Sequence, residues 1–160
     1  MLGRLEKSIV IGVAPEKVWK MLALDRQVEW SFYGWKNVEY TSKIHTSEDK
    51  YRIGTSAHII EEHEEFDYEI TESIRNERLT GRQFNFSKSG NVTMTVTYIL
   101  KPLEEGTRIT AVVEYEMPNI ILRMIARLSK RQGEKAFEKS LKKLRSILEQ
   151  DANRQIIDDQ

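Results

Sequence analysis

The chain has 160 residues, a formal net charge of zero and no cysteine. This length fits one domain with a single core, and the missing cysteines exclude disulfides, thiolate chemistry and cysteine-based zinc or iron–sulfur sites. A balanced charge argues against a general nucleic-acid-binding protein, which is usually strongly basic. No apolar run reaches the ~20 residues of a membrane-spanning helix, and the first residues lack the apolar core of a signal peptide, so we expect a cytoplasmic protein.

The first predicted elements are a strand and two short helices. Residues 4–13 alternate loosely between apolar and polar side chains, which predicts a strand. Pro15 suits the first turn of a helix, and Asp25 is placed to cap a second helix that runs to about Trp30. An aromatic turn follows at residues 32–35. Its side chains either pack the helices against a sheet or line the mouth of a pocket.

The middle of the chain is rich in strand patterns. Six further strands are predicted at residues 36–45, 51–60, 66–75, 79–86, 92–100 and 109–117. The acidic run at residues 61–65 is predicted to be a hairpin loop. The last two strands alternate large apolar residues with threonine and glutamate, which is typical of a sheet that is wet on one face and covered on the other.

A long helix is predicted over residues 119–150, with Asn119 as its candidate N-cap. Its two apolar stripes, within residues 121–128 and 137–148, fall on roughly opposite faces of a straight helix. We therefore expect a bend at Gly133 or two different neighbours. The side chains of the first stripe either belong to the core, form a gate over a cavity or contact another subunit. Residues 1–150 form a single domain in this prediction, and the polar residues 151–160 form a flexible tail.

Charge is unevenly distributed along the chain. Nine acids outnumber two bases between residues 48 and 72, whereas nine bases outnumber three acids between residues 119 and 150. A basic C-terminal helix commonly presents a solvated face, and its cations also interact favourably with the helix dipole. The alternatives are attraction to an anionic ligand, to an acidic partner or, peripherally, to an anionic lipid surface.

This order of elements predicts an α+β fold, in which a curved antiparallel sheet of about seven strands surrounds one long helix. One helix cannot fill the interior of such a sheet, so side chains or a ligand must close the remaining space. Residues 8–19, with their Ala-Pro-x-x-Val-Trp run, and residues 121–149 resemble the START/Bet v 1-like (SRPBCC) superfamily, particularly its polyketide cyclase/dehydrase and lipid-transport branch. The resemblance implies a helix-grip fold with a deep apolar cavity.

The candidate cavity residues lie on the faces of the predicted strands and helices that are expected to be covered by the rest of the protein. Tyrosines among them are either satisfied by the protein or offer their hydroxyls into the cavity. Glu72 is predicted to lie on the same face of its strand as Phe66, Tyr68 and Ile70, and it is the candidate general acid or base. The alternative is that it reaches water at the end of the sheet. Gln83 and Asn85 are predicted to lie on the same face of their strand as Leu79. The predicted lining comprises Trp19, Phe66, Tyr68, Ile70, Met94, Val96, Tyr98, Val113, Tyr115, Met124, Ile125, Leu128, Phe137 and Leu141.

No nucleotide-binding glycine loop, serine-hydrolase elbow or helical histidine pair occurs in the sequence, so we expect no cofactor and no metal. The leading hypothesis is a carrier or sensor that binds a hydrophobic small molecule such as a lipid, a quinone or a polyketide-like compound. The alternative is a cyclase or dehydratase that uses a pocket glutamate or tyrosine for proton transfer. A third possibility is an interaction domain that presents its acidic hairpin or basic helix to a protein. The oligomeric state stays open.

Overall fold

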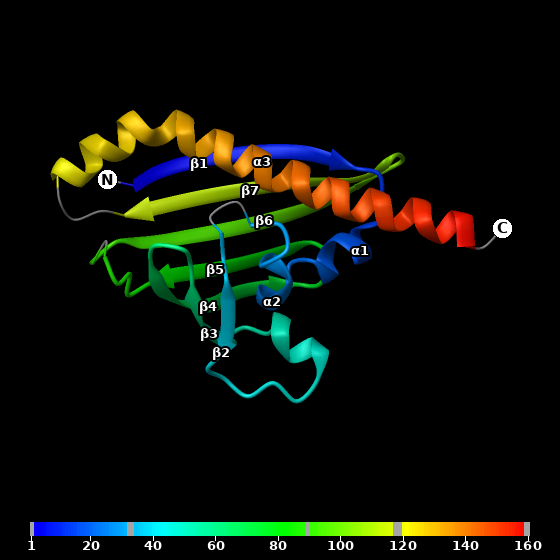
Figure 1. The fold of residues 1–160 in the computed structure, drawn as a ribbon, viewed down its shortest axis with the longest axis horizontal. Helices are drawn as coiled ribbons and strands as arrows, with labels where there is room; N and C mark the ends of the chain where they lie inside the picture. Colours follow the sequence, from blue (N-terminus) through cyan, green and yellow to red (C-terminus); the bar gives the residue numbers. More distant parts are fainter. Residues whose placement is uncertain (1, 32–33, 89, 117–119, 159–160) are drawn as a thin grey trace.

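The computed structural model describes residues 2–31, 34–88, 90–116 and 120–158, with Leu2 and residues 120–129 described by their backbone alone. A seven-stranded antiparallel sheet curves around two short helices, and a long C-terminal helix runs across it (Figure 1). The elements in chain order are β1 (Leu2–Ile11), α1 (Pro15–Lys20), α2 (Leu24–Gln27), β2 (Asn37–Tyr40), the 3-10 helix η1 (Ser47–Tyr51), β3 (Ser56–Ile60), β4 (Glu65–Ile74), β5 (Arg78–Phe84), β6 (Thr93–Leu103), β7 (Gly106–Glu116) and α3 (Ile120–Asp158).

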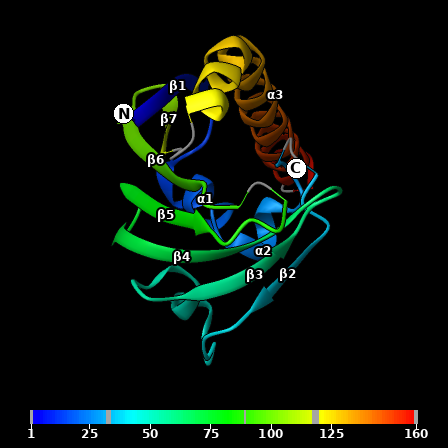
Figure 2. The same ribbon diagram turned by 90° about the vertical axis from the view of Figure 1, so that its left-hand side faces the viewer.

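The strand order is β1-β7-β6-β5-β4-β3-β2, so β2 to β7 form a meander and the first strand pairs with the last. Figure 2 shows the curvature of the sheet, with α1 and α2 on its concave side. Helix α3 packs mainly along β1. The arrangement confirms the predicted α+β helix-grip fold, with two short helices after the first strand and one long helix at the end.

The start of the second helix differs from the prediction. Its N-cap is Ala23, which makes no side-chain capping bond, so Asp25 is not the cap. The Asp25 carboxylate instead accepts hydrogen bonds from the Tyr40 hydroxyl at 3.1 Å and the Lys50 ammonium at 2.7 Å. Asp25 therefore ties α2 to β2 and η1, because tertiary partners outcompete the local capping bond.

Strands β2 and β3 are shorter than predicted. A capping box between Thr46 and Asp49 starts η1, and the Asp49 carboxylate also accepts the backbone N–H of His45 at 2.8 Å. These local bonds hold residues 47–51 in a 3-10 turn, so β3 begins only at Ser56. The Tyr51 ring, placed by this turn, stacks on Trp19 with ring centroids 5.3 Å apart.

Helix α3 passes through Gly133 without interruption and continues to Asp158, eight residues beyond the predicted end at Gln150. Figure 1 shows its first turns, in yellow, at a slope different from that of the rest. A Cβ atom at Gly133 would lie 3.0 Å from Leu5 Cδ1, so the glycine allows the helix to approach β1 closely. The cap predicted at Asn119 lies outside the described residues, and the domain boundary and flexible tail stay predictions.

The core lies between the concave face of the sheet, the two short helices and the C-terminal half of α3. Leu141, Leu144 and Leu148 are buried, as the second apolar stripe predicts. Trp30 is almost fully buried and donates its indole N–H to the Met21 carbonyl at 2.9 Å, which fixes the ring after α2. Among the described residues, no helix is both long and apolar enough to span a membrane.

Candidate ligand-binding cavity

A cavity of about 280 Å³ lies on the concave side of the sheet. It is bounded by α2 and the segment after it, the β3–β4 hairpin, strands β4 to β6 and the middle of α3. Most of its walls are apolar or aromatic. The described lining residues are Gln27, Trp30, Ser31, Trp35, Glu61, Glu64, Tyr68, Gln83, Phe86, Val92, Met94, Val96, Tyr98, Phe137 and Ser140.

Five of the predicted cavity residues line this space. Tyr68 comes from β4; Met94, Val96 and Tyr98 come from alternate positions of β6; and Phe137 comes from α3. Alternation along β6 places its three side chains on one face of the sheet. The alternation along β6 and the apolar stripe of α3 therefore each identify residues of one cavity wall.

Four other predicted residues support the cavity without lining it. Phe66 is fully buried. Its ring centroid lies 5.0 Å from that of Phe86, on which it stacks, and 5.9 Å from that of Trp35, which it meets edge-on, so it supports two aromatic residues of the lining. Ile70 and Val113 are buried core residues. Trp19 is occupied by its stacking contact with Tyr51.

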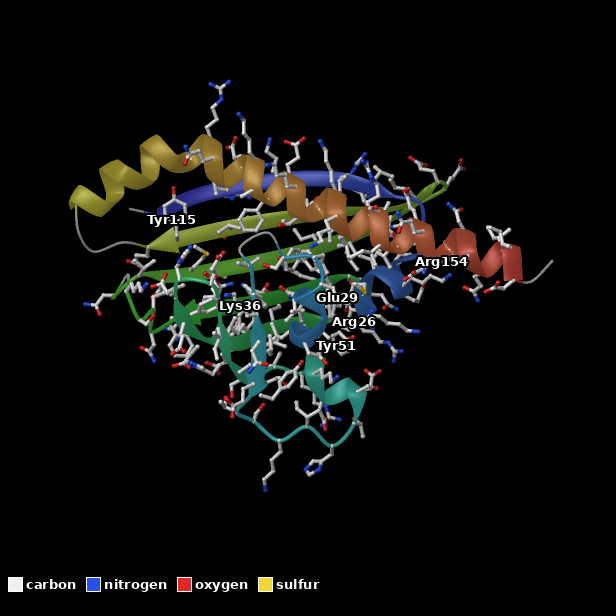
Figure 3. All side chains as sticks on the ribbon, in the orientation of Figure 1. Arg26, Glu29, Lys36, Tyr51, Tyr115 and Arg154 are labelled. Carbon is white, nitrogen blue, oxygen red and sulfur yellow. The ribbon has the colours of Figure 1, made fainter. Side chains whose placement is uncertain are left out.

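The remaining predicted lining residues lie elsewhere. Tyr115 is near the C-terminal end of β7, where its ring covers Gly3 of the neighbouring strand (Figure 3). Leu141 is buried and borders a shallow groove between β1 and α3 instead. The side chains predicted for the first half of α3 lie outside the described residues: Met124, Ile125 and Leu128.

Glu72 is not among the residues that line the cavity. The pairing of β4 with β5 shifts register between Ile70 and Glu72, so Ser73 instead of Glu72 pairs with the buried Leu79. This β-bulge turns Glu72 to the outer face, where its carboxylate lies 2.9 Å from the Arg78 guanidinium and is 44% exposed. A catalytic role for Glu72 therefore has no geometric support.

Several cavity residues were not predicted to line it. Trp35 belongs to the aromatic turn that the sequence leaves open between packing and pocket, and Gln83 lies on the covered phase of β5. Val92 precedes β6 on the same alternating phase as Met94, and Ser140 lies in the middle of α3. The others come from helix ends and loops, where no periodicity marks them. The full set not predicted comprises Gln27, Trp30, Ser31, Trp35, Glu61, Glu64, Gln83, Phe86, Val92 and Ser140.

Two polar side chains of the described cavity wall make no hydrogen bond with another described residue. Tyr68 on β4 and Gln83 on β5 pair directly across the sheet and are 1% and 8% exposed. Within the described part of the chain, neither the Tyr68 hydroxyl nor the Gln83 amide makes a hydrogen bond, and both line the cavity. Burial raises the pKa of the Tyr68 phenol, which therefore stays protonated. Both side chains line the cavity, so these two groups are available to hydrogen-bond a molecule bound there.

Glu61 brings a carboxyl group to the same cavity. The β3–β4 turn holds it, because the Glu61 backbone N–H donates to the Glu64 carbonyl at 2.8 Å. Burial, together with repulsion from the Glu64 carboxylate, raises the pKa of Glu61 from 4.5 to about 7, against the opposing effect of a hydrogen bond with Trp35. A carboxyl group with this pKa can donate or accept a proton near neutral pH. The acidic run is thus only partly a solvated loop.

The raised pKa predicts how Glu61 affects stability. Between about pH 4.5 and pH 7 the folded protein binds more protons at this site than the unfolded chain, so the side chain increasingly destabilises the fold as pH rises. Glu61→Gln removes the charge and keeps an acceptor for Trp35, so we expect its Tm to exceed that of the parent chain above pH 7 and to match it near pH 4. Thermal unfolding across this range checks the expectation. Exposed Glu62 provides the control Glu62→Gln, and a pH-independent difference for Glu61→Gln would contradict the assignment.

His58 and its acidic neighbours lie on the opposite face of the sheet from the cavity. His58 Nδ1 is 3.0 Å from Asp67 and its Nε2 is 3.4 Å from Glu65. Hydrogen bonding to Asp67 and then to Glu65 raises the pKa of His58. Across the described ranges, no group of three or more histidine, aspartate or glutamate side chains is arranged to hold a metal ion.

Solved structures share this fold at low sequence identity. Protein MLL2253 of Mesorhizobium loti has a TM-score of 0.70 at 17% identity, with 92% of this chain and 98% of that chain covered. Protein CV1439 of Chromobacterium violaceum has a TM-score of 0.66 at 18% identity, with 91% and 96% covered. The Aha1 dimer of Colwellia psychrerythraea has a TM-score of 0.63 at 15% identity, with the same coverage of 91% and 96%. These similarities establish the fold alone.

The family of the chain follows from the sequence match. No curated protein matches it. Residues 3–149 match the family model described as "Polyketide cyclase / dehydrase and lipid transport", which spans all seven strands and the first three quarters of α3. The structural neighbours agree with the resemblance seen in residues 8–19 and 121–149. The chain therefore belongs to the polyketide cyclase/dehydrase and lipid-transport family of the START/Bet v 1-like (SRPBCC) superfamily.

Proposed function

We propose that this chain binds an apolar or amphipathic small molecule in the cavity and acts as its carrier or sensor. The observation that carries the proposal is an aromatic cavity in which the Tyr68 hydroxyl and the Gln83 amide have no partner among the described residues. Small-molecule sites commonly combine apolar walls with a few convergent polar groups. The aromatic walls supply the binding energy, and the two polar groups orient the molecule.

The size of the cavity favours a compact ligand. Its volume of about 280 Å³ lies at the lower end of the roughly 300–1,000 Å³ typical of small-molecule sites. A ring system such as a quinone or a small polyketide-like compound matches this space better than a lipid with two long chains. The family description includes both polyketide chemistry and lipid transport, and the volume supports the smaller class.

An enzymatic role is the second candidate, and Glu61 is the observation that favours it. Its carboxyl group lines the cavity with a pKa of about 7, which suits a general acid or base. In this alternative Glu61 replaces Glu72 as the pocket glutamate of a cyclase or dehydratase. The two functions separate experimentally, because Glu61→Gln would abolish turnover of an enzyme and only shift the affinity of a carrier.

Native mass spectrometry of freshly purified protein, followed by organic extraction, tests the proposal. We expect a compact apolar molecule to co-purify and to rebind to the stripped protein. Tyr68→Phe removes the unpaired hydroxyl with little change of shape and should weaken rebinding about five- to tenfold, the value of one hydrogen bond. Tyr40→Phe, whose hydroxyl bonds Asp25 outside the cavity, is the matched control. Rebinding that is insensitive to Tyr68→Phe would show that the hydroxyl does not contact the ligand.

A further inference from the structure

The charges of the cavity lining have one sign. Glu61 and Glu64 are the charged residues of the described lining, and no lysine or arginine accompanies them there. Lys36 is next to Trp35 in the chain, yet it is exposed and does not line the cavity (Figure 3). A ligand that carries a carboxylate or a phosphate would meet repulsion here, with no basic partner in the described wall.

No described lysine or arginine is among the residues that shift the pKa of Glu61. The described side chains that act on its pKa are the Trp35 indole, which is hydrogen-bonded to it, and the like-charged Glu64 on the same hairpin. Removing a carboxylate from water is costly unless a positive group pairs with it. Glu61 is only partly buried, and no described basic side chain contributes to its pKa shift, so a cation bound in the cavity could pair with its carboxylate.

The other walls suit the same kind of group. Six aromatic residues line the cavity, and the faces of aromatic rings attract cations. Trp35 connects the two features, because its N–H holds Glu61 while its ring meets Tyr68 edge-on at 6.1 Å. The described aromatic set comprises Trp30, Trp35, Tyr68, Phe86, Tyr98 and Phe137.

We propose that the ligand of this cavity is a compact aromatic or alicyclic amine, whose protonated nitrogen pairs with Glu61 and whose ring system packs among the aromatic walls. This inference rests on the proposed small-molecule binding and adds the charge of the ligand to it. The Tyr68 hydroxyl and the Gln83 amide remain available for a polar substituent on the body of the ligand.

Binding of a protonated amine is coupled to a proton at Glu61. Below neutral pH the carboxyl group is mostly protonated, so formation of the ion pair releases that proton to the buffer while the amine keeps its own. Above neutral pH the carboxylate is already ionised and no proton is released. The affinity for the amine should therefore rise as pH increases from about 6 to about 8. Besides Glu61, the ionisable side chains of the described lining are Glu64, Tyr68 and Tyr98. The uncharged polar groups of the described lining comprise the indoles of Trp30 and Trp35, the amides of Gln27 and Gln83, and the hydroxyls of Ser31 and Ser140.

Three probes of matched shape test the charge preference: naphthylmethylamine, naphthylmethanol and naphthoate. Isothermal titration calorimetry at about pH 8 should give roughly tenfold tighter binding of the amine than of the alcohol, and the weakest binding for the carboxylate. Titration of the amine at about pH 6, in buffers with different ionisation enthalpies, should reveal the released proton.

Glu61→Gln supplies the decisive variant. It should reduce the affinity for the amine to about that for the alcohol and abolish proton release. Glu62→Gln removes an equal charge from an exposed position of the same hairpin and should preserve the preference. Near-ultraviolet circular dichroism of both variants verifies that the aromatic packing is retained.

The outcomes separate this inference from the proposed function. An amine preference that is lost only in Glu61→Gln supports both. Equal binding of amine and alcohol, or tighter binding of naphthoate, overturns the cationic ligand and leaves the cavity function intact. Failure of all three probes to bind counts against the cavity function itself, and the amine proposal falls with it. Extraction of a neutral or acidic molecule from the purified protein likewise overturns the amine proposal alone.

Discussion

Gly81→Ala should destabilise the protein by about 1–3 kcal/mol, although alanine ordinarily stabilises a strand relative to glycine by about 0.5–1 kcal/mol. The sign reverses because the Tyr68 side chain lies directly over Gly81, and a Cβ atom there would approach its ring and hydroxyl to less than 3.0 Å. Tyr68 is fully buried, with Trp35 against one edge of its ring. Denaturant unfolding of the variant measures the effect.

The same substitution should also weaken ligand binding. Tyr68 lines the cavity, so we expect the displaced ring to move into it and to occupy space that a ligand would fill. Tyr68→Leu shortens the side chain and should make Gly81→Ala tolerable, so a double-mutant cycle should give a favourable coupling of about 1 kcal/mol or more. Additive effects of the two substitutions would mean that the ring does not rest on Gly81.

The strands that build the cavity were predictable because their signal is local. In β6 and β7 the alternation of apolar with polar residues fixes which side chains face the helix, and the structure places Val96 and Tyr98 on the cavity wall accordingly. The stripe that includes Phe137 likewise gives the inward face of α3. Periodicity reveals the face of an element but not the position along it. It also does not show how far across the sheet the cavity extends. Tyr115 pairs with the cavity residue Met94, but it belongs to the next strand, where its ring covers Gly3.

Glu72 was assigned to the wrong face because a β-bulge leaves no reliable mark in a single sequence. The expectation extended the phase of Phe66 and Ile70 by two more residues, which holds only for regular pairing. The register shift after Ile70 turns the following side chains to the opposite face of the sheet. Glu72 then forms an ion pair with Arg78 of the next strand, outside the cavity. Pairing between strands, not the strand itself, decides such positions.

The chemistry of the site was harder to predict than its walls. Glu61 belongs to a run of acids that has the composition of a solvated hairpin, and Glu62 in the same run is indeed exposed. What distinguishes Glu61 is its contact with Trp35, which lies 26 residues earlier in the chain and reaches the hairpin only in the folded protein. Its raised pKa comes from burial in the folded protein and from repulsion by Glu64, and the hydrogen bond with Trp35 opposes both effects. The shift is therefore a property of the tertiary structure. A run of like charges indicates a loop without showing which of its members are partly buried.

Val96→Trp should abolish binding while the protein remains folded. Val96 is in the middle of β6, is 3% exposed and lines the cavity between Tyr98 and Met94. An indole at this position points inward and fills space that is otherwise open, so the cost of overpacking is smaller than in a closed core. We expect at least a tenfold weaker affinity, because the ligand loses contacts that bury its apolar surface. Titration with the extracted molecule or with naphthylmethanol measures the loss.

Thr95→Trp is the matched control, since it introduces the same indole on the same strand one residue away. Alternation directs the side chain of Thr95 to the outer face of the sheet, beside Arg82 and Glu114 on the flanking strands. This variant should bind as the parent chain does. If Val96→Trp unfolds at a much lower temperature than the control, Val96→Phe fills less space and repeats the test. Normal binding by a folded Val96→Trp protein would place the ligand outside the cavity and reject the proposed function, because the indole and the ligand cannot occupy the same volume.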